Sequence, residues 1–141
     1  MKNIVQTKTP VYITLEDIVR LAKSEKEPHG HRLVELHSLG FHQKVVEHLL
    51  QNPKKVMERA RQRVSEWLDG EQPFAGSKAY ALAWQELLNQ PVNKIIDILL
   101  SDTPKARALR QTTPFAGEIS EEEREEVIRV IKPFVFESKT L

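Results

Sequence analysis

Five histidines lie close together in this chain and are the first residues to suggest chemistry. Their positions are His29, His31, His37, His42 and His48. Histidines that bind one metal from a helix lie three or four residues apart, whereas the successive gaps here are two, six, five and six. The absence of cysteine also excludes thiolate ligands and thiol catalysis. We therefore expect no metal site and no cofactor, and interpret the histidines as surface or partly buried side chains that add some pH sensitivity.

A cluster of glutamates is the second candidate for chemistry. It comprises Glu121, Glu122, Glu123, Glu125 and Glu126. Two carboxylates act as acid and base only when their surroundings separate their pKa values, usually through burial. These glutamates instead follow Ser120 in the pattern of a capping box, where the helix dipole favours negative charge. Since the chain shows no nucleophile paired with a base and no phosphate-binding loop, we expect a protein that is not an enzyme.

A run of basic residues indicates a candidate nucleic-acid face on one helix. It comprises Lys54, Lys55, Arg59, Arg61 and Arg63. A basic helix face is the electrostatic signature of phosphate binding. Glu58, Glu66 and Asp69 interrupt the run, so a solvated face with ion pairs along the helix is the alternative. The formal net charge of +1 is also small for a dedicated DNA-binding domain.

The string at residues 109–117 is the best candidate for a partner-binding surface. It combines an arginine, an amide, two hydroxyls and an aromatic at an expected bend, and its candidate residues are Arg110, Gln111, Thr112, Thr113, Pro114 and Phe115. Arginine and aromatic side chains are common anchors of protein interfaces. A purely structural corner is the alternative, with Arg110 tying loop carbonyls or an acid together. The Pro-Phe-Ala-Gly of this string also occurs at 73–76.

Helical periodicity and helix-start signals dominate the rest of the chain. They predict helices over about 14–24, 33–51, 53–69, 77–88, 92–100, 104–110 and 120–132. Gly40 is expected to bend or interrupt the second of these, and Pro133 to end the last. In the predicted helix at 77–88, the apolar stripe comprises Tyr80, Ala83, Trp84, Leu87 and Leu88. We expect Trp67 and Trp84 in one core.

Two short apolar runs, at 11–13 and 134–136, contain strand-forming residues and are too short for helices. The predicted fold class is therefore all-α, a single compact multi-helix domain with short extended N- and C-terminal arms. The sequence has no run of the roughly 20 apolar residues that span a bilayer and no signal-peptide pattern at its start. We expect a cytoplasmic protein with no membrane contact.

Several pieces of the chain together resemble a small bacterial family. They are His42 to Leu50, Asn52-Pro53, Arg59-Ala60-Arg61, Trp67, Trp84 to Leu88, Leu109 to Gly117 and Glu123-Arg124. The most specific piece is Leu-Arg-Gln-x-x-Pro-Phe-Ala-Gly followed by Glu-Arg. The resemblance covers 42–124 and divides the chain into an N-terminal arm with the first helices (1–41), a family-like helical domain (42–133) and a tail (134–141), all within one folded unit.

The family that the chain resembles looks like the antitoxin partners of two-gene toxin–antitoxin operons. The resemblance implies a non-enzymatic protein that binds and neutralises a toxin enzyme. We expect the loop at 110–117 and one terminal arm to contribute to the contact. The alternative is a nucleic-acid-binding transcriptional regulator that uses the basic helix face, as a homodimer. The chain departs from the pattern because no complete DNA-binding module precedes residue 42.

Overall fold

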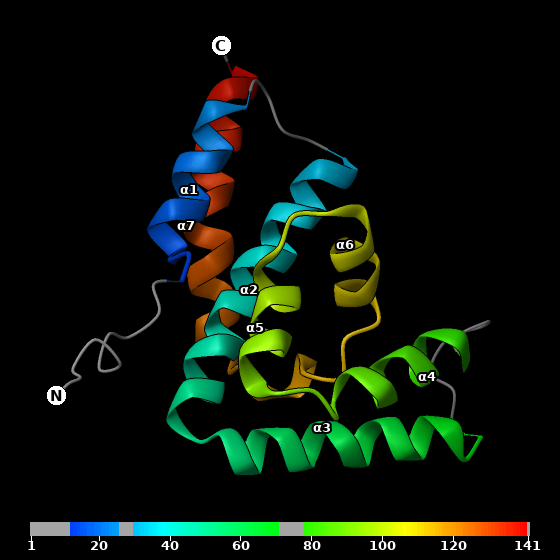
Figure 1. Ribbon diagram of the computed structural model, residues 1–141. Coiled ribbons are helices and arrows are strands. Elements are labelled where there is room, and N and C mark those ends of the chain that lie inside the picture. Colours follow the sequence, from blue (N-terminus) through cyan, green and yellow to red (C-terminus); the bar gives the residue numbers. More distant parts are fainter. Residues whose placement is uncertain (1–11, 26–29, 71–77, 141) are drawn as a thin grey trace, which may run out of the picture.

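The computed structural model describes residues 12–25, 30–70 and 78–140, with side chains described up to Ile131 (Figure 1). Its α-helices are α1 (Leu15–Ser24), α2 (His31–Gln51), α3 (Pro53–Leu68), α4 (Lys78–Leu87), α5 (Val92–Leu100), α6 (Pro104–Gln111) and α7 (Glu121–Thr140). A short 3-10 helix, η2 (Ala116–Glu118), lies between α6 and α7. All regular structure in these ranges is helical, which confirms the predicted all-α class.

Three hydroxyl side chains begin helices as the sequence predicted. Thr14, Thr103 and Ser120 each accept a hydrogen bond from the backbone N–H three residues later, at 3.1, 3.2 and 3.1 Å. The predicted cap at Asn52 was wrong, because its side chain makes no such bond, although α3 begins at Pro53 as expected. Ser77, the predicted cap of α4, lies outside the described residues, as does the first Pro-Phe-Ala-Gly copy.

The helix α2 is the centre of the fold and contacts α1, α3, α5, α6 and α7. Figure 1 shows α3 crossing one end of the molecule, with α4 beside it. The larger core joins α2 to the helices from α3 to α6 and contains both tryptophans, as predicted. The smaller core contains Ile18, Leu39, Val127 and Ile131, from α1, α2 and α7. The predicted boundary between the segments 1–41 and 42–133 lies inside α2, which is one continuous helix.

Of the two predicted effects of Gly40, a bend or an interruption, the interruption does not occur, since α2 is continuous from His31 to Gln51. Gly40 lies where α2 is in close contact with α7. A Cβ atom added at Gly40 would be 2.6 Å from Val127 Cγ1, which is shorter than any ordinary contact. The glycine therefore permits the two helices to approach, and burial of the neighbouring side chains offsets its low helix propensity of about 1 kcal/mol relative to alanine.

The prediction that Pro133 ends the last helix was also wrong, since α7 continues to Thr140 and the run at 134–136 is helical. A proline in a helix loses one backbone hydrogen bond and disfavours the preceding turn. Val127 and Ile131, which precede the proline, pack in the smaller core, so the helix is anchored up to this point.

The contact at Gly40 predicts that Gly40→Ala destabilises the protein by about 1–3 kcal/mol, because the new methyl group overlaps Val127. Urea unfolding measures the change. In a Val127→Ala background the same substitution should instead stabilise, because the overlap is gone and alanine favours the helix by about 1 kcal/mol. An equal effect in both backgrounds would show that the close approach is not what requires glycine.

Candidate functional site

The side chain of Arg110 lies inside the protein, where it caps the C-terminal end of α5. It is 2% exposed. Its Nη1 donates hydrogen bonds to the backbone carbonyls of Ile98 and Leu99, both at 3.3 Å, and to that of Ser101. Carbonyls in the last turn of a helix have no partner within it, and a cation there also complements the helix dipole. Arg110 therefore ties α6 to α5 from within.

An ion-pair network lies beside this arginine and joins α2 to the α5–α6 connection. Asp102 accepts hydrogen bonds from Arg32 and from Arg107, each at 3.0 Å. Arg32 also binds Glu25, and Arg107 approaches Glu35 to 3.6 Å. Burial would raise the pKa of Asp102, but the hydrogen bonds from the two arginines lower it below its ordinary value.

The remainder of the bend is held by buried contacts. Phe115 is fully buried and meets Trp84 edge to face, with ring centroids 5.8 Å apart. Thr113 Oγ1 accepts a hydrogen bond from the backbone N–H of Phe115 at 3.0 Å. Arg63 of α3 donates to the carbonyl of Pro114 at 2.8 Å. The bend is thus fixed to the core from several sides.

These contacts do not favour Arg110 and Phe115 as anchors for a partner. Both are inside the protein, and the structural alternative accounts for them. Pro114 is buried as well, whereas Thr112 and Thr113 are half-buried and Gln111 is exposed. Of the six candidate residues, Gln111 is therefore the one that is exposed.

Helical periodicity contained a signal for the burial of Arg110. Ala106, Leu109 and Arg110 lie at positions i, i+3 and i+4 and are the three buried residues of α6. This spacing is that of the buried face of a helix. An arginine in such a stripe indicates a guanidinium that is hydrogen-bonded inside the fold. This position was overlooked because arginine is usually a surface residue.

The predicted nucleic-acid face comprised Lys54, Lys55, Arg59, Arg61 and Arg63, and the structure does not gather them on one surface. Arg59 makes a two-point contact with Glu118, at 2.9 and 2.8 Å. Arg61 turns to the other flank of α3 and donates to the carbonyl of Leu88 at 3.2 Å. Arg63 reaches the bend. The three arginines thus hold neighbouring segments, and nucleic-acid binding stays a prediction that this geometry does not favour.

The histidines lie in separate surroundings. His42 is buried; its Nδ1–H donates to the carbonyl of Ser38 at 2.8 Å, and its Nε2 has no partner among the described residues. Burial lowers the pKa of His42 to about 4. His48 contacts Glu123 at 2.9 Å, whereas His29 lies outside the described residues. Within the described ranges, no group of three or more potential metal ligands lies close enough to hold a metal ion.

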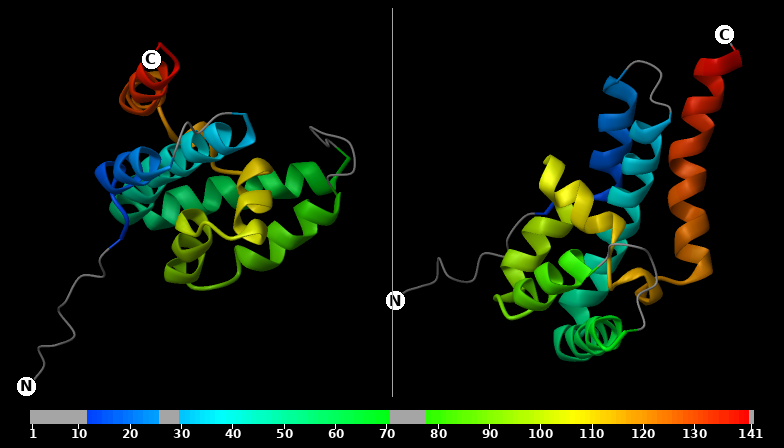
Figure 2. Two further views of the ribbon diagram at one scale, coloured as in Figure 1. Left: turned by 90° about the horizontal axis from the view of Figure 1, so that it is seen from above. Right: turned by 90° about the vertical axis from the view of Figure 1, so that its right-hand side faces the viewer.

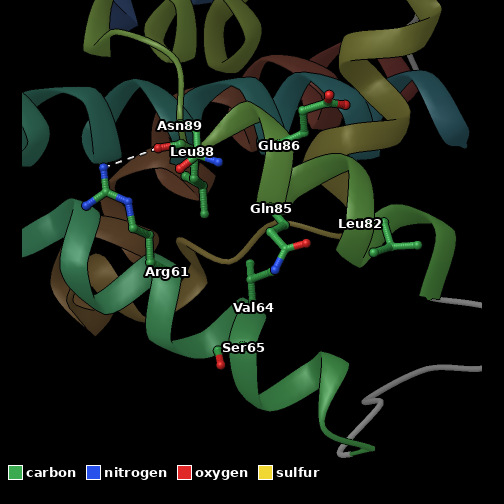
Figure 3. Close-up of a pocket in the computed structure, with 8 residues that line it drawn as sticks. All are labelled: Arg61, Val64, Ser65, Leu82, Gln85, Glu86, Leu88 and Asn89. Carbon is green, nitrogen blue, oxygen red and sulfur yellow. Dashed lines mark hydrogen bonds between the residues drawn. The ribbon is translucent and has the colours of Figure 1, made fainter.

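Two open grooves flank α4. The groove between α3 and α4 has a volume of about 630 Å³, with Val64 and Leu88 among its apolar residues and Arg61 and Gln85 among its polar ones (Figure 3). A second groove of about 520 Å³ lies between α4, α5 and α6.

Four large apolar side chains are exposed within the described ranges, and sequence reasoning singled out none of them as functional. They are Val34 at 58%, Leu50 at 52%, Leu82 at 48% and Tyr80 at 39%. The predicted stripe of this helix was right at Trp84 and at Leu88, which follows the end of α4, since both are buried. Tyr80 and Ala83 were also expected in it but are exposed, and α4 buries Ala81 as well. The helix is apolar on both faces, so periodicity alone did not show which face is covered.

No family model, curated protein or solved structure matches this chain. The observations that bear on function are thus the geometry of the fold and the motifs between residues 42 and 124 that resemble the antitoxin-like family. Within the part of the chain that the structure describes, no helix has the length and apolar character needed to cross a bilayer.

The buried position of Arg110 predicts that Arg110→Ala lowers the free energy of unfolding by about 3 kcal/mol, because the carbonyls at the end of α5 lose their donor. Urea unfolding tests this. The control is Arg107→Ala, whose partly exposed ion pairs contribute at most about 1 kcal/mol. An Arg110→Ala protein with wild-type stability would restore the interpretation of this arginine as a partner anchor.

The lowered pKa of His42 predicts a loss of stability in mild acid. The folded pKa is about 4 and the ordinary value is 6.5, so the unfolded chain takes up the proton first as the pH falls. Between about pH 7.5 and about pH 5 this removes about 2 kcal/mol of stability, and the loss is complete below the folded pKa.

The comparison of wild type with His42→Gln by urea unfolding across this pH range isolates the effect. The variant should lack this part of the pH dependence. His31→Gln, at an exposed histidine, is the matched control and should retain it. Parallel pH profiles for wild type and His42→Gln would show that His42 titrates equally in both states.

Proposed function

We propose that this chain is a non-enzymatic, antitoxin-like protein that binds and neutralises a toxin enzyme. The resemblance of residues 42–124 suggests the class of partner. The observation that carries the proposal is Val34, the most exposed large apolar side chain in the described ranges, at 58%, which lies beside Gln111 of the candidate bend.

The proposed contact is the α2–α6 face, which we define as Val34, Ser38, Arg107 and Gln111. These residues line one small cavity between α2 and α6. Val34 offers apolar area, Gln111 offers both a donor and an acceptor, and Arg107 adds a charge held in place by Asp102. An apolar centre with a polar rim is typical of interfaces between proteins that also exist apart.

The interior of the protein supports this face. Arg110, directly beneath it, fixes α6 to α5, and the Asp102 network fixes α6 to α2. A surface that is ordered before binding loses less conformational entropy when a partner docks. A stable complex buries roughly 800 Å² on each protein. The contact therefore extends beyond these four residues, far enough to cover a toxin's active site or to hold the toxin in an inactive form.

The test is co-expression with the protein encoded by the gene next to its own. That protein alone should arrest bacterial growth, and this chain should restore growth and form a complex that isothermal titration calorimetry detects. Val34→Glu should weaken binding by about tenfold or more, since it places a charge at the centre of the contact.

Leu50→Glu is the matched control, because Leu50 is similarly exposed on the same helix but lies outside the α2–α6 face. It should bind and restore growth like the wild type. The proposed function fails if the neighbouring protein is harmless or is not bound. If it is bound equally by the Val34→Glu and wild-type chains, the partner uses another surface.

A further inference from the structure

We infer that α4 carries a self-association surface, on which a second copy of this chain docks its own α4 in the antiparallel direction. The inference goes beyond the proposed function and does not depend on it. The helix α4 packs on α3 at the edge of the molecule (Figure 2). Its face opposite the buried Trp84 therefore has no covering element in the described part of the chain.

That outward face is apolar at its centre. Leu82 is 48% exposed, and Ala79 and Ala83 beside it are exposed as well. The positions i, i+3 and i+4 place these three side chains on one stripe. A soluble helix normally turns such a stripe toward a core and charged residues toward water. The stripe here would be covered by a second protein surface.

Charged residues flank this centre symmetrically. Lys78, Leu82 and Glu86 follow one another at intervals of four residues, so they form one ridge roughly 12 Å long. Neither Lys78 nor Glu86 has an ion-pair partner among the described residues. A two-fold axis through Leu82 places the lysine of each copy beside the glutamate of the other. The ridge is thus complementary to itself, which a two-fold interface requires.

The stability of α4 does not explain where these charges lie. Negative charge is favoured in the first turn of a helix and positive charge in the last turn. In α4 the arrangement is reversed, since Lys78 is in the first turn and Glu86 in the last. In an antiparallel pair each charge instead lies beside the opposite end of its neighbour's helix, where the dipole favours it. The second copy therefore accounts for charges that oppose the helix dipole in the single chain.

The shape beside the ridge also suits this occupant. Leu82 forms one edge of the groove between α3 and α4, with Val64 and Leu88 further along it (Figure 3). Leu82 of the second copy would enter this groove next to its counterpart, and the small side chains of Ala79 and Ala83 permit close approach. A contact centred on two short helices is smaller than a standard interface. The dimer should therefore be weak and form in the micromolar range.

Analytical ultracentrifugation of the purified 141-residue chain over a range of concentrations tests the inference. The wild type should pass from monomer to dimer, and Leu82→Glu should remain a monomer at every concentration. Leu50→Glu removes an equally exposed leucine from α2 and should dimerise like the wild type. Far-ultraviolet circular dichroism confirms that each variant is folded.

Charge reversal tests the antiparallel register. Lys78→Glu and Glu86→Lys should each weaken self-association by about tenfold or more, since the two-fold axis turns both ion pairs into repulsions. Both changes agree with the helix dipole, so neither variant should lose helix stability. An equimolar mixture of the two variants should dimerise again, because each lysine then faces a glutamate.

A wild type that remains monomeric up to millimolar concentration would overturn the inference. So would self-association that Leu82→Glu leaves intact, or a mixture of the two charge variants that associates no better than either alone. If the wild type is monomeric and Leu82→Glu loses binding to the protein encoded by the neighbouring gene, the face belongs to that partner and not to a second copy.

Discussion

The second half of this protein is organised around one buried guanidinium. Arg110 supplies the hydrogen-bond donor that the end of α5 lacks, and so determines where α6 must lie. The direction of α6 in turn places the Leu109 carbonyl within 3.1 Å of the Trp84 indole N–H. Phe115 then packs against that indole. A charge enclosed in the core thus connects the end of α5 to α6, and through α6 to Trp84 and the bend.

The fold separates two surfaces by placing them on different helices. The α2–α6 face is supported by the ion-pair network around Asp102, whereas α4 is attached to the body through α3 and the burial of Trp84. Neither surface shares a side chain with the other. The two proposed contacts therefore use separate sets of residues, so that the one proposed for a partner and the one proposed for a second copy need not compete.

Local signals in the sequence determined most of the helices but not how the helices meet. Hydroxyl caps at Thr14, Thr103 and Ser120 depend on neighbouring residues only, so they could be predicted. That Gly40 would not interrupt its helix could not be predicted, because the role of this glycine depends on Val127 of a distant helix. Pro133 was misjudged because a local rule for helix ends was applied to it. Arg110 was misassigned because residue type received more weight than its position in the stripe with Ala106 and Leu109. The exposed face of α4 could not be predicted, since both of its faces are apolar.

The smaller core has a consequence for the order in which contacts form while the protein is being synthesised. It combines Ile18, near the start of the chain, with Val127 and Ile131, more than a hundred positions later. On the ribosome the chain emerges from its N-terminus, and contacts between distant residues form late. Helix α1 can contact α2 while synthesis continues, but the part of this core that α7 supplies stays open until Val127 and Ile131 leave the exit tunnel. Newly made chains therefore pass through a stage in which Ile18 and Leu39 are only partly covered, and the arrival of α7 ends it.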